Sequence, residues 1–234
     1  MDLSDGGSSG RRNMRKNGRT RGAKASPGKT GRSAAAGRSK SPGADGQAAT
    51  AAFLAAVSRG DFTAAAEALD ILVVVEPDNA KLHYNHALAL RLSGRVKDAL
   101  AAARRARSLD TANAKALFEI AASALEAGEP AASLEAGSAY LADHPGDADA
   151  ALNAARAALL VDRPDAALAL LESVAAADAT DAHRLCRGET LRDLGRFEEA
   201  EKAWAQAAPT LAGQILSLRS KGPRGRMALN PSRP

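Results

Sequence analysis

The chain has 234 residues, of which 45% are hydrophobic but only seven are aromatic, so bulky side chains for one compact core are scarce. A single cysteine, Cys186, excludes an internal disulfide and suits a reducing compartment. The sequence contains no stretch of 18 apolar residues that would predict a membrane span, and no apolar secretory signal is visible. We therefore expect a cytoplasmic protein.

The charge differs sharply between regions. Residues 1–46 contain 11 Lys and Arg against three Asp, a net charge of +8. Residues 47–218 contain 16 basic and 24 acidic residues, a net charge of −8, and residues 219–234 contain five basic residues and no acid. The excess of positive charge therefore belongs to the two ends, and the body between them is acidic.

Residues 1–46 are rich in Gly, Ser, Arg and Lys and contain almost no apolar residues. We expect them to be disordered, because they cannot bury enough apolar surface to offset the entropy of ordering. Three interpretations remain open: a solubilising leader without a partner, a tether or targeting segment, and a polycation that contacts nucleic-acid phosphates or an anionic surface without sequence specificity. The polycation interpretation would use Arg11, Arg12, Arg15, Lys16, Arg19 and Arg21.

From residue 47 to residue 219, apolar and small residues recur at three- and four-residue steps, which predicts short amphipathic helices. The first pair is expected at 47–59 and 62–75, with a turn at Gly60 and a stop at Pro77. The pattern then repeats with a period of 34 residues over 80–113, 114–147, 148–180 and 181–214. The fourth unit is one residue shorter than the others.

Pro209 opens a last predicted helix, at about 210–219. Its apolar face consists of Leu211, Ile215, Leu216 and Leu218. The polar outer side of a terminal cap is expected to consist of Gln214, Ser217 and Arg219. Any part of the apolar face that the fifth unit leaves uncovered becomes a dimer or partner surface. Residues 220–234 form a second basic tail, which we also expect to be disordered.

A helix–turn–helix unit of this length resembles the tetratricopeptide repeat (TPR) family. The family has small residues where the two helices of a unit pass closest, here Ala87, Ala121 and Ala155 on first helices and Ala65, Ala99, Ser133, Ala167 and Ala200 on second helices. It has glycine in the turn, here Gly60, Gly94, Gly128 and Gly195, with Asp162 in the fourth unit. The resemblance implies an all-α solenoid of about five hairpins over residues 47–219, with a C-terminal capping helix.

In the family, the first helices line a concave groove that holds a partner peptide. Transferred to this chain, the resemblance implies a groove formed by Lys81, Tyr84, Asn85, Arg91, Lys115, Phe118, Glu119, Asn153, Arg156 and Arg192. Asn side chains there would bond a peptide backbone, and the cations would receive carboxylates. The set matches only part of the carboxylate clamp of chaperone-binding members, and the two aromatic residues have an alternative role in packing between helices.

No catalytic, metal or cofactor site is predicted. His83 and His86 are three residues apart on one helical face, but two ligands do not complete a zinc site. Cys186 has no positioned His or Asp that would make it a nucleophile.

We therefore interpret the chain as a non-catalytic scaffold or adaptor that binds a peptide or helix of another protein. Two alternatives stay open. One is an adaptor associated with nucleic acid or an anionic surface through its basic tails. The other is an accessory subunit of an enzyme system whose catalytic part is another chain. The oligomeric state is not predicted, and the Ala, Arg, Gly and Asp bias is typical of GC-rich bacterial genomes.

Overall fold

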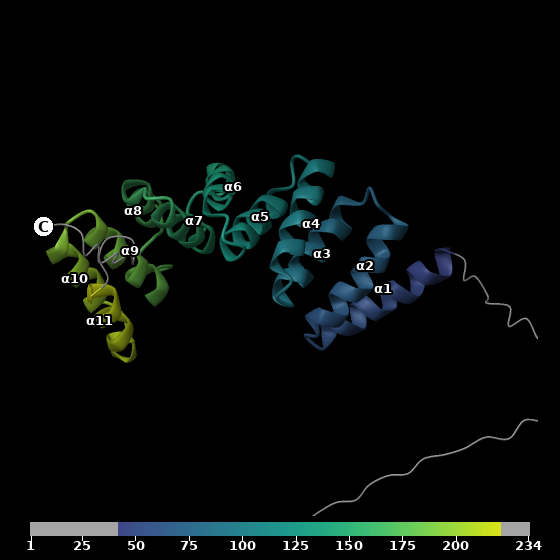
Figure 1. Cartoon of the computed structure of the whole chain (residues 1–234), viewed down its shortest axis with the longest axis horizontal. Coiled ribbons are helices and arrows are strands. Elements are labelled where there is room, and N and C mark those ends of the chain that lie inside the picture. Colours follow the sequence, from purple (N-terminus) through teal and green to yellow (C-terminus); the bar gives the residue numbers. More distant parts are fainter. Residues whose placement is uncertain (1–41, 221–234) are drawn as a thin grey trace, which may run out of the picture. The chain divides into compact units, whose positions relative to one another are not determined.

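The structure is a computed structural model that describes residues 42–220, with side chains described from residue 45. The described residues form α-helices and one 3-10 helix, and no strand occurs among them (Figure 1). The elements are α1 (Pro42–Ser58), α2 (Phe62–Val75), α3 (Ala80–Leu92), α4 (Val96–Leu109), α5 (Ala114–Glu126), α6 (Pro130–Asp143), α7 (Ala148–Leu160), α8 (Pro164–Glu172), α9 (Asp181–Asp193), α10 (Phe197–Ala205), η1 (Pro209–Leu211) and α11 (Ala212–Ser220).

The helices pack as five consecutive hairpins, from α1–α2 to α9–α10. The first helix of each later hairpin packs on the second helix of the hairpin before it, and α3, α5, α7 and α9 also contact one another in succession. Each hairpin thus depends on its sequence neighbours alone, as in a solenoid. The fold confirms the predicted all-α, TPR-like solenoid with a terminal helix.

The first helix starts earlier than the sequence pattern predicts. It begins at Pro42 instead of residue 47, so the residues from 42 to 46 belong to α1 and not to the expected tail. Proline suits the first turn because the missing N–H has no helical partner there, and Asp45 in that turn complements the helix dipole. Residues 1–41 and 221–234 lie outside the described residues, and with them the predicted tail disorder and the basic residues proposed to contact anions.

The turns inside the hairpins follow one backbone pattern. Gly94, for example, has φ of 85°, a left-handed conformation that glycine adopts without steric cost. Asp162 occupies the same place in the fourth hairpin with φ of 63°, the only positive φ of a non-glycine residue among those described. Aspartate tolerates this conformation better than most side chains, which explains how it substitutes for glycine here.

Small side chains let the two helices of a hairpin approach closely. Ala87 and Ala99 are fully buried between α3 and α4, and similar pairs recur along the stack. In the third hairpin the hydroxyl of Ser133 on α6 donates a hydrogen bond of 2.7 Å to the carbonyl oxygen of Ala121 on α5. Alanine brings little apolar area, so close packing of many helices has to supply the stability.

The fifth hairpin packs differently, because it contains the only tryptophan of the chain. Trp204 on α10 is 2% exposed and lies against Gly188 on α9, where a Cβ atom would sit 2.1 Å from the indole nitrogen. The indole N–H donates to the carbonyl oxygen of Leu185 at 3.2 Å. Glycine at position 188 therefore creates the space for the ring.

The last helix, α11, covers this C-terminal hairpin. Ile215 is buried and, with Leu211 and Leu218, joins the cluster around Leu191 and Trp204. Leu216 points outward and is 64% exposed. The predicted apolar face is thus divided: most of it docks on the fifth hairpin, and Leu216 does not.

Candidate functional site

Two of the predicted groove residues pair with each other. Arg91 on α3 lies 2.5 Å (Nε) from Oε1 of Glu119 on α5, and its Nη1 lies 3.2 Å from Oε1 of Glu126. Glu119 is 1% exposed and also accepts a hydrogen bond from the Ser123 hydroxyl. Burial and the nearby Glu119 charge raise the pKa of Tyr84, the neighbouring phenol on α3.

A buried carboxylate is costly unless an opposite charge and hydrogen bonds compensate it. Arg91 and Glu119 therefore join the second hairpin to the third. Sequence reasoning assigned both residues to a partner, but the structure uses their charges within the chain.

Arg192 also has an internal role. It is 6% exposed, and its Nη2 lies 2.6 Å from Oδ1 of Asp193 and 3.4 Å from Oε1 of Glu189. Its Nη1 donates to the backbone carbonyl of Leu218. Arg192 thus connects α9 to α11, and its guanidinium N–H groups bond within the chain instead of to a ligand.

Phe118 packs between the helices of its own hairpin, the alternative role that the sequence left open. Its ring contacts Tyr140 on α6 edge-on, with ring centroids 5.5 Å apart. Tyr140 in turn stacks on His144 at 4.3 Å and donates to Oδ2 of Asp147 at 2.9 Å. These contacts hold the end of α6 against the start of α7.

The remaining predicted residues stay available at the surface of the first helices. We call them the inner face: Lys81, Tyr84 and Asn85 on α3, Lys115 on α5, and Asn153 and Arg156 on α7. Lys81, Lys115 and Arg156 are exposed, and none of the ion pairs among residues 45–220 involves them.

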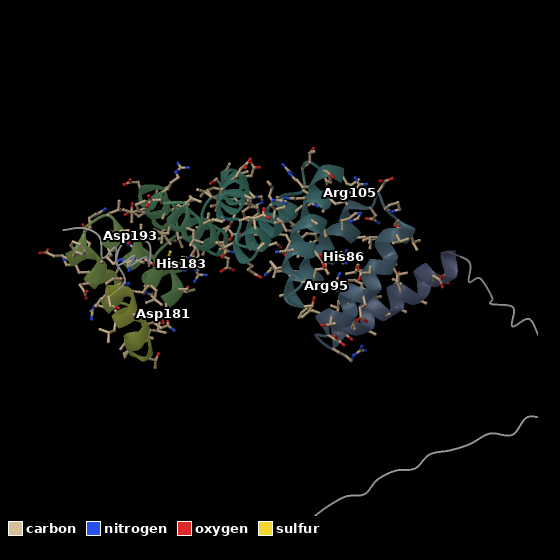
Figure 2. The ribbon with its side chains drawn as sticks, viewed as in Figure 1. His86, Arg95, Arg105, Asp181, His183 and Asp193 are labelled. Atoms are coloured by element: carbon tan, nitrogen blue, oxygen red, sulfur yellow. The ribbon has the colours of Figure 1, made fainter. Side chains whose placement is uncertain are left out.

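Many basic residues elsewhere are neutralised within the chain. Arg95 bonds Asp70 at 3.1 Å and Arg105 bonds Asp78 at 2.9 Å; Figure 2 labels both arginines. The cations of the inner face have no acidic partner among residues 45–220, and the same is true of Lys97 on α4 and Lys202 on α10.

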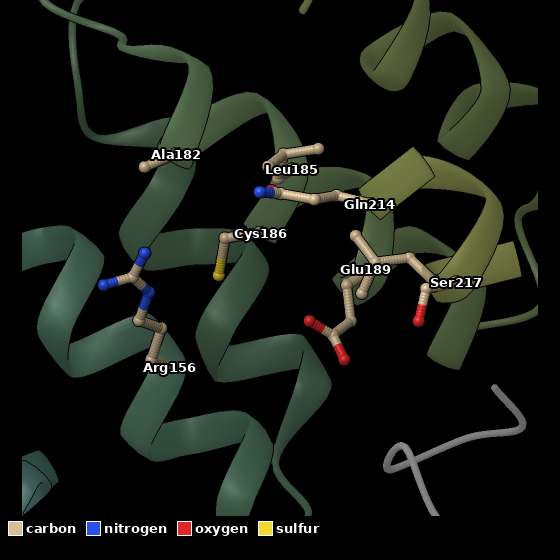
Figure 3. Close-up of a pocket in the computed structure, with 8 residues that line it drawn as sticks. Arg156, Ala182, Leu185, Cys186, Glu189, Gln214 and Ser217 are labelled. Atoms are coloured by element: carbon tan, nitrogen blue, oxygen red, sulfur yellow. The ribbon is translucent and has the colours of Figure 1, made fainter. Parts of the chain in front are cut away.

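A pocket of about 320 Å³ continues the inner face at its C-terminal end, between α7, α9 and α11. Figure 3 shows Arg156 on one side of Cys186 and Glu189 on the other, with Gln214 reaching in from α11. Ser217 also lines the pocket, so Gln214 and Ser217 do not simply form the outer side of a cap. The repeat period could not predict that these two residues line a pocket, because α11 lies outside the repeats.

Cys186 and the two histidines of α3 make their contacts within the chain. Cys186 is 5% exposed, and burial raises the pKa of its thiol to about 12, so the thiolate required of a nucleophile is scarce at neutral pH. Nε2 of His83 lies 2.8 Å from the carbonyl oxygen of Pro77, while His86 packs against Asp70. No cluster of three or more potential metal ligands occurs in the part of the chain that the structure describes.

Among the described helices, none combines the length and apolar character needed to cross a membrane.

Comparison with known proteins agrees with this architecture. The sequence model of the tetratricopeptide repeat family matches residues 50–116, which run from α1 into α5. No curated protein matches the sequence.

Several solved structures share the fold. MamA 41-end from Desulfovibrio magneticus RS-1 superposes with a TM-score of 0.64 at 15% identity, covering 76% of this chain and 97% of that one. Another MamA crystal structure gives a TM-score of 0.63 at 18% identity, covering 76% and 94% of the two chains. A tetratricopeptide repeat protein from Parabacteroides merdae ATCC 43184 gives 0.60 at 20% identity, covering 74% and 67%. The family match over residues 50–116 and the five hairpins together show a tetratricopeptide-repeat-like fold.

Proposed function

We propose that this protein is a non-catalytic scaffold that binds an extended, acidic segment of a partner protein along the inner face. The observation that carries the proposal is the set of three exposed cations, Lys81, Lys115 and Arg156, on three neighbouring first helices. Each of these cations would bind a carboxylate of the partner through a charge-assisted hydrogen bond. Asn85 and Asn153, on α3 and α7, add donors and acceptors for a peptide backbone.

The spacing of the cations suggests the spacing of the acidic residues. Lys81 and Lys115 occupy the same position in successive repeats, and packed helices lie about 8–10 Å apart. An extended chain advances about 3.3 Å per residue, so this interval corresponds to about three residues of the partner.

In α7 the equivalent position is Asp149, and the cation is Arg156, seven residues later. Seven residues span about 10 Å along a helix, so the bound segment would have to run obliquely towards the pocket. The segment we expect therefore carries acidic residues at positions i, i+3 and about i+7. Glu189 and α11 line the far side of the pocket, which disfavours a further acidic residue beyond Arg156.

The test is a fluorescence-anisotropy titration with a labelled peptide that carries aspartates at this spacing. Lys115→Glu combined with Arg156→Glu should weaken binding at least tenfold, because two attractive contacts become repulsive. The matched control is Lys97→Glu combined with Lys202→Glu, which changes the net charge equally on the second helices α4 and α10. The control should bind within about twofold of the unchanged protein, and equal losses in both double variants would contradict the proposal.

A second arm separates the inner face from the basic tail. Deleting residues 1–39 should leave the affinity for the acidic peptide in place, because all proposed contacts lie in the hairpins. If binding disappears with the tail, the tail is the acidic-ligand site and the inner face is not. A peptide of the same composition with shuffled aspartate positions tests the spacing, and equal affinity for both peptides would reject a defined register.

A further inference from the structure

The N-terminal end of the stack carries a second surface that the proposed peptide site does not use. A hollow of about 640 Å³ lies between α1 and α2. Its floor consists of small apolar residues, among them the exposed Ala48, Ala52 and Ala55. Its rim carries Ile71, Asp45, Arg59 and Glu67.

The repeat period shows what this hollow corresponds to. His86 and Ala89 on α3 stand 34 residues after Ala52 and Ala55, and they are 8% and 4% exposed because the first hairpin covers them. The same positions on α5, Ile120 and Ser123, are also buried. The hollow is therefore the surface on which a preceding hairpin would pack, and in this structure it faces outward.

This end lacks the polar outer side that a terminal repeat needs for solubility. Ile71 is 48% exposed and Val74, one turn further along α2, is 78% exposed. By composition, residues 1–41 contain only Met1, Leu3 and Met14 as large apolar side chains. The opposite end of the stack is closed by α11, so a head-to-tail contact between copies would have no open complementary end.

We propose that this N-terminal end face, defined by Ala48, Ala52, Ala55, Ile71 and Val74, pairs with the same face of a second copy about a two-fold axis. The face is self-complementary in shape, because the ridge of Ile71 and Val74 on one copy fits the alanine-lined hollow of the other. It is also self-complementary in charge.

The charge complementarity comes from α1 and the residue that follows it. Asp45 lies in the first turn of α1 and Arg59 directly follows its last residue, so the two line opposite ends of the hollow, about 21 Å apart at the helical rise. When two copies of α1 run antiparallel, Asp45 of each copy meets Arg59 of the other. In the single chain, no ion pair among residues 45–220 uses Arg59.

The size of the face sets the strength of the pairing. Two adjacent helices of about 25 Å present on the order of 500 Å² per copy, about 1,000 Å² in total. This is the lower end of specific interfaces, so the dimer is reversible and its population depends on protein concentration.

The experiment is sedimentation velocity of the full chain over a wide concentration range at low salt. The unchanged protein should shift from monomer to dimer as its concentration rises, and Ile71→Asp should remain monomeric with an unchanged circular dichroism spectrum. Ile71 is half exposed, so this substitution leaves the fold of the single chain intact. A concentration-independent monomer, or a dimer that Ile71→Asp does not affect, would overturn the proposal.

Charge reversal tests the antiparallel arrangement directly. Asp45→Arg and Arg59→Asp, each alone, should weaken pairing at least tenfold, because like charges then face each other at both ends. An equimolar mixture of the two single variants should recover dimers, since each introduced charge meets its opposite in the other variant. Dimers that persist in both single variants, or a mixture that stays monomeric, would contradict the two-fold arrangement.

Discussion

The two ends of the stack differ in how the apolar face of the terminal hairpin is covered. At the N-terminal end, the first hairpin is built from alanine and aliphatic residues, and Ile71 and Val74 remain exposed. At the C-terminal end, a tryptophan fills the space above Gly188, and α11 covers the hairpin with Ile215. In a solenoid each unit is stabilised by its neighbours, so an end either acquires an extra covering element or keeps an open interface. This chain has one end of each kind.

The largest expected effect is at the closed end. Trp204→Ala removes the ring that α9, α10 and α11 share and should destabilise the C-terminal hairpin by about 3–5 kcal/mol. Urea unfolding followed by far-ultraviolet circular dichroism should show an early transition of this end, because a repeat array need not unfold in one step. Phe197→Ala is the control on the same helix, since Phe197 is 65% exposed and its loss should cost at most about 0.5 kcal/mol.

Gly188→Ala should change the stability of the folded chain in opposite directions depending on whether Trp204 is present. In the unchanged chain the new methyl group collides with the indole and should cost about 1–3 kcal/mol. In the Trp204→Ala background the collision is gone, and alanine should stabilise the helix by about 0.5–1 kcal/mol relative to glycine. A double-mutant cycle measures the coupling, and additive effects would show that the ring does not depend on the gap at position 188.

A smaller effect comes from comparing two isoleucines, one at each end. Ile215→Ala should loosen the docking of α11 by about 2 kcal/mol, the low end for a buried isoleucine, because a terminal helix releases only its own contacts. Ile71→Ala should change the stability of the monomer by less than about 0.5 kcal/mol. Amide hydrogen exchange of α11 and α2 reports the two effects separately, and similar losses at both sites would remove the contrast between the ends.

The smallest effect is a pH dependence of the contact between the first and second hairpins. Nε2 of His86 on α3 lies 2.9 Å from Oδ1 of Asp70 on α2, in a geometry that does not make a good hydrogen bond. Burial lowers the pKa of His86 below its ordinary value, and the nearby Asp70 opposes this only in part. The folded chain therefore binds this proton less tightly than the unfolded chain.

The sign of the effect follows from linkage. The contribution of neutral His86 is complete above the unfolded pKa of about 6.5 and is lost as the pH falls below that value towards the folded pKa. Thermal unfolding at pH 7.5 and pH 5.5 should show a larger drop for the unchanged protein than for His86→Gln. The variant removes this titration while leaving all others, so an equal drop in both proteins would assign the pH dependence to other groups.

Much of the fold could be predicted from the sequence, because the determinants are local. The recurrence of small and apolar residues at three- and four-residue steps specifies which side of each helix is buried. The turn residues specify where each helix ends. Asp162 was predicted to replace glycine, and its positive φ confirms it. The start of α1 was predicted less well, because a helix can extend into a polar, glycine-containing segment when its first turn is favourable.

The candidate site could be predicted only in part. The repeat period indicates that Lys81, Lys115 and Arg156 lie on first helices, and the structure leaves them exposed. The same reasoning placed Arg91 and Arg192 there as well, but their guanidinium groups are taken up by Glu119 and Asp193.

The hairpins and their order are encoded locally in the amino-acid sequence, because helix propensity, apolar periodicity and turn chemistry act over a few residues. Which charges remain free depends on packing between helices, since the contact of Arg91 with Glu119 spans 28 residues and that of Arg192 with the backbone of Leu218 spans 26. Long side chains on neighbouring helices reach such partners in ways that a one-dimensional pattern does not encode. The same holds for the two ends, since a covering helix or an open hollow results from packing between elements rather than from the repeat itself.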